Sequence, residues 1–220
     1  METDVPQGLI NQKKNYIKMN RGTVLVGGVI ASNCVVFGAW DASRSDRKLQ
    51  RFMMDNFTVS YNNVIRKHNY HTLVTSAFSH KDSYHLFSNM ITLYFFGIDL
   101  ALILGARRFA ALYLTASGVS SLAQIYSPYY VPKNWLSPHN PYRRISSVQR
   151  DAIPSLGASG ALSAVITYSV LYAPRRIILF NLFVPMPMAL FGVGFIAQDL
   201  YGYYQGTGNV GYGAHLGGKH

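Results

Sequence analysis

Four polar side chains stand inside otherwise apolar stretches of this sequence, and their types suit hydrolytic chemistry. Ser159 lies in Gly-Ala-Ser-Gly, and His215 lies in Gly-Ala-His-Leu near the C-terminus. A serine hydroxyl beside an imidazole is a common pairing of nucleophile and general base. His85 and Asn89 are four residues apart, so on a helix they share one face. From that face both side chains could donate hydrogen bonds to a developing oxyanion.

The small residues around the candidate nucleophile and base indicate close helix packing. Gly157 and Gly160 each destabilise a helix by up to ~1 kcal/mol relative to alanine, so a packing or chemical demand must outweigh that loss. Small residues let membrane helices approach each other closely. Ala214 and Gly218 flank the candidate base in the same way. We therefore expect the two segments to pack together and to bring the hydroxyl and the imidazole within hydrogen-bond reach.

The elements that must position these side chains have the pattern of membrane-spanning helices. The chain has 220 residues, of which 49% are hydrophobic and 13% charged, and the apolar residues form long blocks. A bilayer crossing needs about 20 such residues. Six segments are candidate spans, the last of them incomplete: 22–40, 84–104, 107–127, 155–173, 177–200 and 210–220. The sequence thus predicts an all-α, polytopic membrane bundle of six helices over 22–220, preceded by a polar, basic tail over 1–21.

The distribution of charge predicts how this bundle is oriented. The net charge is +11, but the basic residues lie between apolar spans rather than on one soluble face, which argues against nucleic acid as a partner. Nine basic residues share the side of the tail, in short connections: Lys13, Lys14, Lys18, Arg21, Arg107, Arg108, Arg175, Arg176 and Lys219. Eleven others are diluted over two long loops, 41–83 and 128–154, together with five acids. Because short loops weigh most in the positive-inside rule, the tail side is expected to be the cytoplasm or the matrix.

The predicted topology brings the four candidate site residues to one depth. Even-numbered spans begin on the side opposite the tail, and each residue lies within about two helical turns of the start of its span, or roughly 10 Å below one surface. Polar residues inside a membrane are costly and usually mark function. Asp99, within the second span, is expected to pair with a neighbouring polar group or to mark the inner interface.

The two long connections differ in pattern. Leu49 to Phe57, LQRFMMDNF, mixes charged and apolar residues and predicts an interfacial amphipathic helix. The 128–154 segment is rich in proline and tyrosine and predicts an irregular surface loop. Cys34 is the only cysteine, which excludes an intrachain disulfide.

Three motifs together resemble the rhomboid intramembrane serine proteases. They are Gly-Ala-Ser-Gly at 157–160, His-x-x-x-x-His-x-x-x-Asn at 80–89 and Ala-His-x-x-Gly at 214–218. The stretches NCVVFGAW, LVTSAFSH and PSLGASGA are most similar to the mitochondrial, presenilin-associated branch of that family. The resemblance covers nearly the whole chain from Asn33 onward.

The resemblance implies cleavage of single-span membrane proteins near the outer membrane face by a Ser-His dyad. Ser159 would be the nucleophile, His215 the general base, His85 and Asn89 the oxyanion stabilisers, and His80 a structural histidine in the same network. No metal or cofactor is expected. The expected partners are transmembrane protein substrates, the lipid bilayer and further members of a membrane complex. The implied location is the mitochondrial inner membrane with the N-terminus in the matrix; the secretory pathway and a bacterial inner membrane are alternatives.

The chain departs from the family pattern in two respects. Many bacterial members carry Trp-Arg in the first loop, where this chain has His71 and Thr72, a change expected to weaken the anchoring of that loop. The extra N-terminal helix of the mitochondrial branch is not in this sequence, and the five residues after His215 add only ~7.5 Å of helix. We therefore expect a fragment in which the sixth span is incomplete and which by itself is not assured of activity.

Other interpretations fit the sequence less well. The order Ser159, Asp199, His215 mimics an α/β-hydrolase triad, but that fold needs Gly-x-Ser-x-Gly, and Ala161 stands at the last glycine position. Asp199 is instead expected to be an interfacial residue that ends the fifth span. Zinc would need a recognisable ligand spacing, and no Cys, Asp or Glu completes one with the four clustered histidines: His68, His71, His80 and His85.

The main functional alternative is an inert rhomboid-like scaffold. Such a protein would bind transmembrane helices for translocation or quality control without cutting them. A small transporter is disfavoured, because the sequence has no inverted repeat and no paired broken helices.

Overall fold

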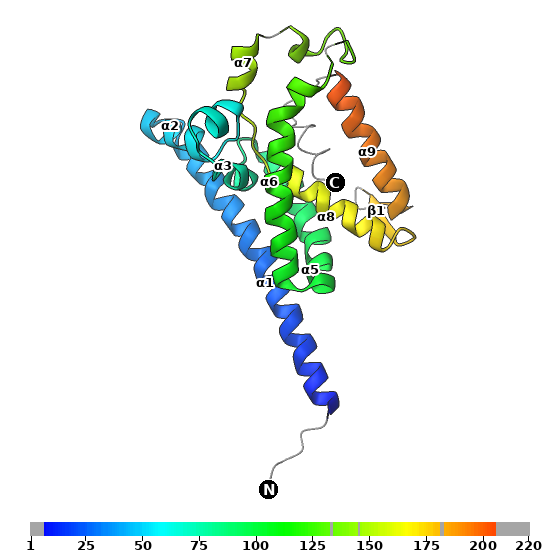
Figure 1. The fold of residues 1–220 in the computed structure, drawn as a ribbon. Helices are drawn as coiled ribbons and strands as arrows, with labels where there is room; N and C mark the ends of the chain where they lie inside the picture. Colours follow the sequence, from blue (N-terminus) through cyan, green and yellow to red (C-terminus); the bar gives the residue numbers. More distant parts are fainter. Residues whose placement is uncertain (1–6, 133, 145, 181–182, 206–220) are drawn as a thin grey trace.

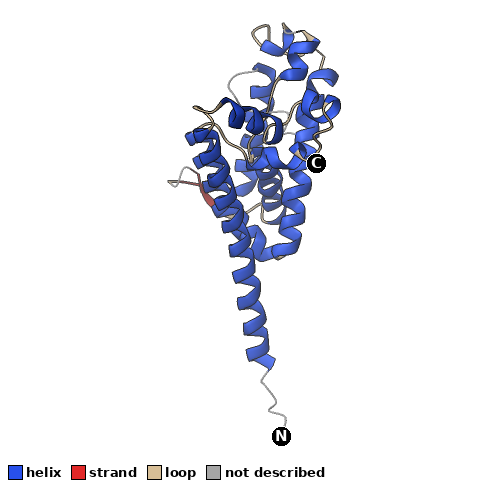
Figure 2. Ribbon diagram, turned by 90° about the vertical axis from the view of Figure 1, so that its left-hand side faces the viewer, coloured by secondary structure: helices blue, strands red, loops and turns tan. Residues whose placement is uncertain are grey.

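The bundle is formed mainly by helices. The computed structural model describes residues 7–132, 134–144, 146–180 and 183–205. The first helix, α1 (Gln7–Ala42), continues through most of the predicted basic tail and extends beyond the rest of the molecule (Figure 1). The other long elements are α4 (Ser83–Thr92), the π-helical turn η3 (Leu93–Gly97), α5 (Ile98–Leu104), α6 (Ala106–Tyr130), α8 (Ser159–Tyr172) and α9 (Met188–Gln205). Helices dominate the second view as well (Figure 2).

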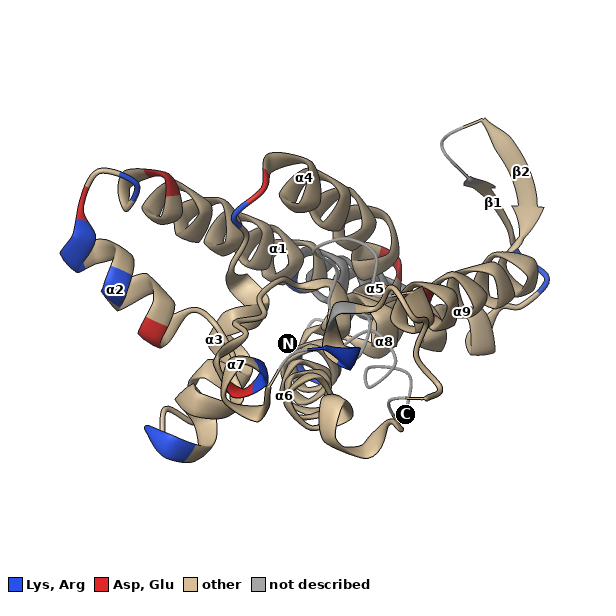
Figure 3. Ribbon diagram, turned by 90° about the horizontal axis from the view of Figure 1, so that it is seen from above, with Lys and Arg blue, Asp and Glu red and all other residues tan. Residues whose placement is uncertain are grey.

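Short helices connect α1 to α4. They are α2 (Arg47–Asn56), η1 (Asn62–Arg66), α3 (Thr72–Thr75) and η2 (Ser76–Phe78), and we call residues 43–82 loop 1. Helix α2 begins where the Asp46 carboxylate accepts hydrogen bonds from the backbone N–H groups of Lys48, at 2.7 Å, and Leu49, at 3.2 Å. It buries Met53, whereas its Lys and Arg residues, blue in Figure 3, are exposed. The amphipathic helix predicted over 49–57 is therefore present, although it begins two residues earlier.

Helix α6 lies at the centre of the bundle. Apolar residues from α1, η3, α5, α6 and α8 form one core cluster, which includes Val26, Leu93, Leu100, Phe109 and Val165. Close approach of α1 to α5 depends on Gly22, because a Cβ at that position would lie 3.2 Å from the carbonyl oxygen of Ala101. The core thus joins α1 to the helices that carry the candidate site.

The outside of the bundle exposes large apolar side chains. Val35 is 73% exposed, Leu171 77% and Phe183 83%, as expected for a surface that lipid covers. Two helical stretches of the described chain are long and apolar enough to cross a membrane, Arg21–Ala42 and Ser83–Leu104, with 22 residues each. They match the predicted spans at 22–40 and 84–104.

The remaining predicted spans differ from expectation. The spans at 107–127 and 155–173 are helical in α6 and α8, but α6 is less apolar, and α8 has 14 residues, fewer than a bilayer crossing needs. The sixth predicted span, 210–220, lies outside the described residues. Six membrane-spanning helices are therefore a prediction that the described fold supports only in part.

The predicted fifth span, 177–200, is wrong in its first half. Residues Ile177–Phe180 (β1) and Val184–Pro187 (β2) form an antiparallel hairpin, and α9 begins only at Met188. Pro185 and Pro187 explain the difference, because proline lacks the amide hydrogen that a helix needs and clashes with the preceding turn. Short apolar runs fit a strand as well as a helix, so the apolar pattern alone could not separate the two. The predicted all-α class is thus corrected to a mainly helical fold with one hairpin.

Two other predictions concern the connections and their charges. The 128–154 segment contains η4 (Pro141–Arg143) and a short helix, α7 (Ser147–Ala152), which a capping box of Ser146 and Gln149 begins. Asp99 pairs as expected: its Oδ2 lies 2.6 Å from Nη1 of Arg176, in the turn before β1. This pair places the end of the second predicted span beside the connection after the fourth, as the predicted topology requires.

Asp199 differs from its predicted role. It lies inside α9 rather than at its end, and it is only 2% exposed. The prediction of an interfacial residue that ends the span is therefore wrong, because α9 continues past it to Gln205.

Candidate functional site

The candidate site lies where the start of α8 meets the first turns of α4. Ser159 is the first residue of α8 and is half-buried. On α4, the Asp82 carboxylate accepts a hydrogen bond of 2.8 Å from the backbone N–H of His85, which fixes the start of this helix. His85 is half-buried, whereas Asn89, one turn later, is buried.

Gly157 allows the imidazole of His85 to approach Ser159. Its φ of +129° falls in a region that side-chain-bearing residues rarely adopt. A Cβ on Gly157 would lie 2.8 Å from Cε1 of His85 and 3.7 Å from Oγ of Ser159. The ring and the hydroxyl therefore both border the space beside this glycine. Gly160, by contrast, is buried within α8 itself.

His80 joins α4 to the start of α8. It is 0% exposed, and its Nε2 lies 2.8 Å from Nδ2 of Asn89 and 3.4 Å from the backbone nitrogen of Ala158. Both neighbours are donors, so Nε2 accepts and the neutral ring carries its proton on Nδ1. Among the described residues Nδ1 has no hydrogen-bond partner.

The charge state of His80 follows from its surroundings. Desolvation, and then the nearby His85, lower the pKa of His80 to about 3. The two imidazoles lie edge to face, with ring centroids 4.9 Å apart. His80 is therefore uncharged at neutral pH, and one N–H of the Asn89 amide is directed at it.

Loop 1 holds the segment that enters α8. The backbone N–H of Gly157 donates to the carbonyl oxygen of Ser76 at 2.9 Å. Val59 and Ser155 exchange two backbone hydrogen bonds of 2.8 Å each. Trp40 of α1 secures the C-terminal part of the loop, since its indole N–H donates to the Ser79 hydroxyl at 2.6 Å. Residues far apart in the sequence thus fix the position of Ser159.

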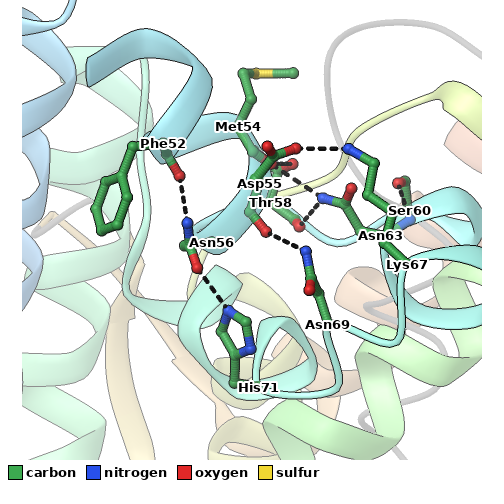
Figure 4. A network of polar contacts seen from close by, with 10 residues as sticks. All are labelled: Phe52, Met54, Asp55, Asn56, Thr58, Ser60, Asn63, Lys67, Asn69 and His71. Carbon is green, nitrogen blue, oxygen red and sulfur yellow. Dashed lines mark hydrogen bonds and ion pairs between the residues drawn. The ribbon is translucent and has the colours of Figure 1, made fainter. Parts of the chain in front are cut away.

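A polar network inside loop 1 includes His71 and Thr72, the residues at which weaker anchoring was predicted. Nε2 of His71 lies 3.0 Å from Oδ1 of Asn56, and the buried Thr72 donates to the carbonyl oxygen of Asn69 at 2.6 Å. Further contacts in this network join the following residues (Figure 4): Met54, Asp55, Thr58, Ser60, Asn63 and Lys67. The loop is therefore anchored by its own polar groups. The sequence could not show this, because most of these contacts join residues that no local pattern connects.

Part of the predicted site is not described. His215, Ala214 and Gly218 lie outside the described residues, so the predicted contact of Ser159 with His215 stays a prediction. Within the described part of the chain, no group of three or more His, Cys, Asp or Glu side chains is placed to hold a metal ion.

These features define a class of protein: an apolar helical bundle in which a serine begins one helix, α8, beside an imidazole from another helix, α4. The Rhomboid domain matches residues 67–219. The chain belongs to the rhomboid family, and the resemblance predicted from its motifs is confirmed.

Curated relatives of the chain include mitochondrial members of this family. RHOMBOID-like protein 12, mitochondrial, of Arabidopsis thaliana is 35% identical over 194 residues, 88% of this chain and 55% of the relative. Rhomboid protein 1, mitochondrial, of Saccharomyces cerevisiae is 33% identical over 198 residues, 89% of this chain and 50% of the relative. Presenilin-associated rhomboid-like protein, mitochondrial, of Homo sapiens is 31% identical over 212 residues, 93% of this chain and 48% of the relative. The chain spans about half the length of these relatives.

Proposed function

We propose that this protein is an intramembrane serine endopeptidase that cleaves single-span transmembrane proteins near the outer membrane face. The observation that carries this proposal is the approach of the His85 ring and the Ser159 hydroxyl to the space beside Gly157. A glycine at positive φ lets this imidazole stand close to the nucleophile, from where it can donate to a substrate oxyanion.

In the proposed mechanism, Ser159 attacks the scissile carbonyl while His215 accepts the hydroxyl proton. The resulting oxyanion receives hydrogen bonds from His85 and from the second N–H of the Asn89 amide, the first being directed at His80. His215 then donates its proton to the leaving amine, and an acyl-enzyme on Ser159 remains. Water deacylates this intermediate, with His215 again acting as base.

His80 has a structural role in this proposal. Because Asn89 and the backbone N–H of Ala158 both reach Nε2 of His80, this ring sets the distance between the oxyanion donors on α4 and the nucleophile on α8. This positioning stabilises the site only while the ring is neutral, because only then can Nε2 accept both hydrogen bonds. The lowered pKa of His80 keeps the ring neutral at neutral pH.

The proposed location is the mitochondrial inner membrane, with the basic N-terminal side in the matrix. The relatives' names place those proteins in mitochondria. The exposed apolar surface and the two span-length helices support a lipid environment. Transmembrane substrates and a surrounding membrane complex are the proposed partners.

The proposal is tested with the complete protein in proteoliposomes that contain a single-span reporter. Ser159→Ala should lower cleavage by at least about 10³-fold while the protein stays folded. Ser169→Ala is the matched control: the same helix loses a hydroxyl that donates to the Val165 carbonyl oxygen at 2.9 Å, and cleavage should be unchanged. A fluorophosphonate probe should label Ser159 in the wild type. Reporter binding without labelling or cleavage would instead identify the scaffold that binds transmembrane helices.

A further inference from the structure

A buried carboxylate, Asp151 of α7, joins three elements that are distant in sequence. Asp151 is 4% exposed, and its Oδ2 lies 2.6 Å from Nη2 of Arg66 in η1. Its Oδ1 accepts a hydrogen bond from the hydroxyl of Tyr129 at the end of α6. We call Asp151, Arg66 and Tyr129 the clasp. Both oxygens of the carboxylate are engaged, as a buried charge requires.

Neighbouring groups hold the clasp in place. The guanidinium of Arg150 lies 4.0 Å from the centroid of the Tyr129 ring, and its Nη1 donates to the carbonyl oxygen of Pro128 at 3.1 Å. Desolvation, and then the hydrogen bond to Asp151, raise the pKa of Tyr129 to about 12. The tyrosine hydroxyl therefore keeps its proton for Asp151 throughout the physiological range.

The clasp lies directly before the segment that leads into Ser159. Residues 153–158 are not helical, so they lack the internal hydrogen bonds of a helix. Their path is set from outside, by the backbone pairing of Ser155 with Val59 and by the donation from Gly157 to Ser76. Both partners belong to loop 1, to which Arg66 also belongs. The clasp fixes where this segment starts relative to the loop that guides it.

We propose that Asp151 is a positioning residue for Ser159. This inference rests on the proposed function. Without the clasp, α7 loses its ion pair with loop 1 and its hydrogen bond from α6, and the start of α8 moves relative to His85. A displacement of about 1 Å in a reacting group can cost roughly 10²-fold in rate, even when the change is made away from the chemistry.

The test measures labelling of Ser159 by a fluorophosphonate in the complete protein, together with kcat and KM for the single-span reporter. In Asp151→Asn the labelling rate constant and kcat should fall roughly 10- to 100-fold, while KM stays within about twofold. The fraction of protein labelled at completion should match the wild type. The double variant Arg66→Gln/Asp151→Asn should be no slower than Asp151→Asn alone, because the pair is already broken.

Two further variants make the test specific. Tyr129→Phe keeps the aromatic ring beneath Arg150 and the ion pair of the clasp, and should slow labelling by less than Asp151→Asn does, so it remains informative if the stronger variant does not fold. Lys67→Gln is the matched control. It breaks an ion pair of 2.7 Å between Lys67 and Asp55 in the same loop, and this pair is separate from the contacts of residues 151–158. It should label at the wild-type rate.

Three outcomes would overturn the inference. Wild-type labelling rates in folded Asp151→Asn and in Tyr129→Phe would show that the clasp does not position the nucleophile. A reduced labelled fraction with an unchanged rate constant would show that Asp151 serves folding alone. Absence of labelling at Ser159 in the wild type would refute the proposed hydrolase, and this inference with it.

Discussion

Acidification is expected to destabilise the folded protein through one buried residue, His80, which precedes α4 and lies outside the predicted spans. Its pKa falls from the ordinary 6.5 to about 3 in the folded state, so between these two values the unfolded chain binds a proton that the folded chain does not. Stability therefore rises with pH across this window. The contribution of His80 is fully present above pH 6.5 and is lost as the pH falls towards 3.

The size of this effect follows from the shift. The full difference corresponds to about 5 kcal/mol, since each pKa unit is worth about 1.4 kcal/mol. Over an accessible interval, from about pH 7.5 to about pH 5.0, the expected loss is about 2 kcal/mol. Asn89 and the backbone N–H of Ala158 both donate to the ring, and His85 stands beside it, so no carboxylate among these contacts would offset a positive charge.

The free energy of unfolding is measured by titration with a denaturing detergent at both pH values, for the wild type and for His80→Gln. The glutamine does not titrate and keeps an acceptor oxygen, so this variant should be less stable at pH 7.5 but lose about 2 kcal/mol less on acidification. His68→Gln, an exposed histidine of loop 1, should show the wild-type pH dependence. Equal pH dependence in the wild type and in His80→Gln would refute the account of a buried neutral imidazole.

Two other substitutions have expected outcomes. Gly157→Ala should lower the rate of Ser159 labelling and cost roughly 1–3 kcal/mol in stability, because its φ disfavours a side chain and the new Cβ would lie 2.8 Å from Cε1 of His85; unchanged labelling and stability would contradict the geometry described for this glycine. Asp99→Asn should cost less than about 1 kcal/mol in thermal or detergent unfolding, because Asp99 and Arg176 are 43% and 51% exposed and water screens their attraction. The control for Asp99→Asn is Arg175→Gln, which breaks no ion pair in the described part of the chain. A larger loss of stability in Arg175→Gln than in Asp99→Asn would argue against a stabilising Asp99–Arg176 pair.

The local parts of the site could be predicted from the sequence. The spacing of His85 and Asn89 places both on one face of α4, as the period of a helix requires. Ser159 was expected near the start of its helix and begins it. The apolar blocks at 22–40 and 84–104 likewise became helices of span length, because a long apolar run has few other folds open to it.

The rest of the site depends on contacts that no local pattern contains. Gly157 admits the ring of His85, which comes from an element some seventy residues earlier in the chain. The bond from Asn89 to His80 and the burial of Asp151 arise only when loop 1, α6 and α7 meet. The hairpin before α9 was missed because the apolar pattern outweighed two prolines whose positions forbid a helix.

The shortness of α8 has a consequence for the proposed membrane setting. Fourteen residues rise about 21 Å, against a hydrocarbon layer of about 30 Å, so helix alone cannot fill the thickness at this point. The remaining thickness must be crossed by non-helical backbone. Its amide and carbonyl groups have no water to bond in lipid, so protein groups must supply their hydrogen-bond partners. In that setting, the backbone groups of Val59 and Ser76 in loop 1 supply some of these partners.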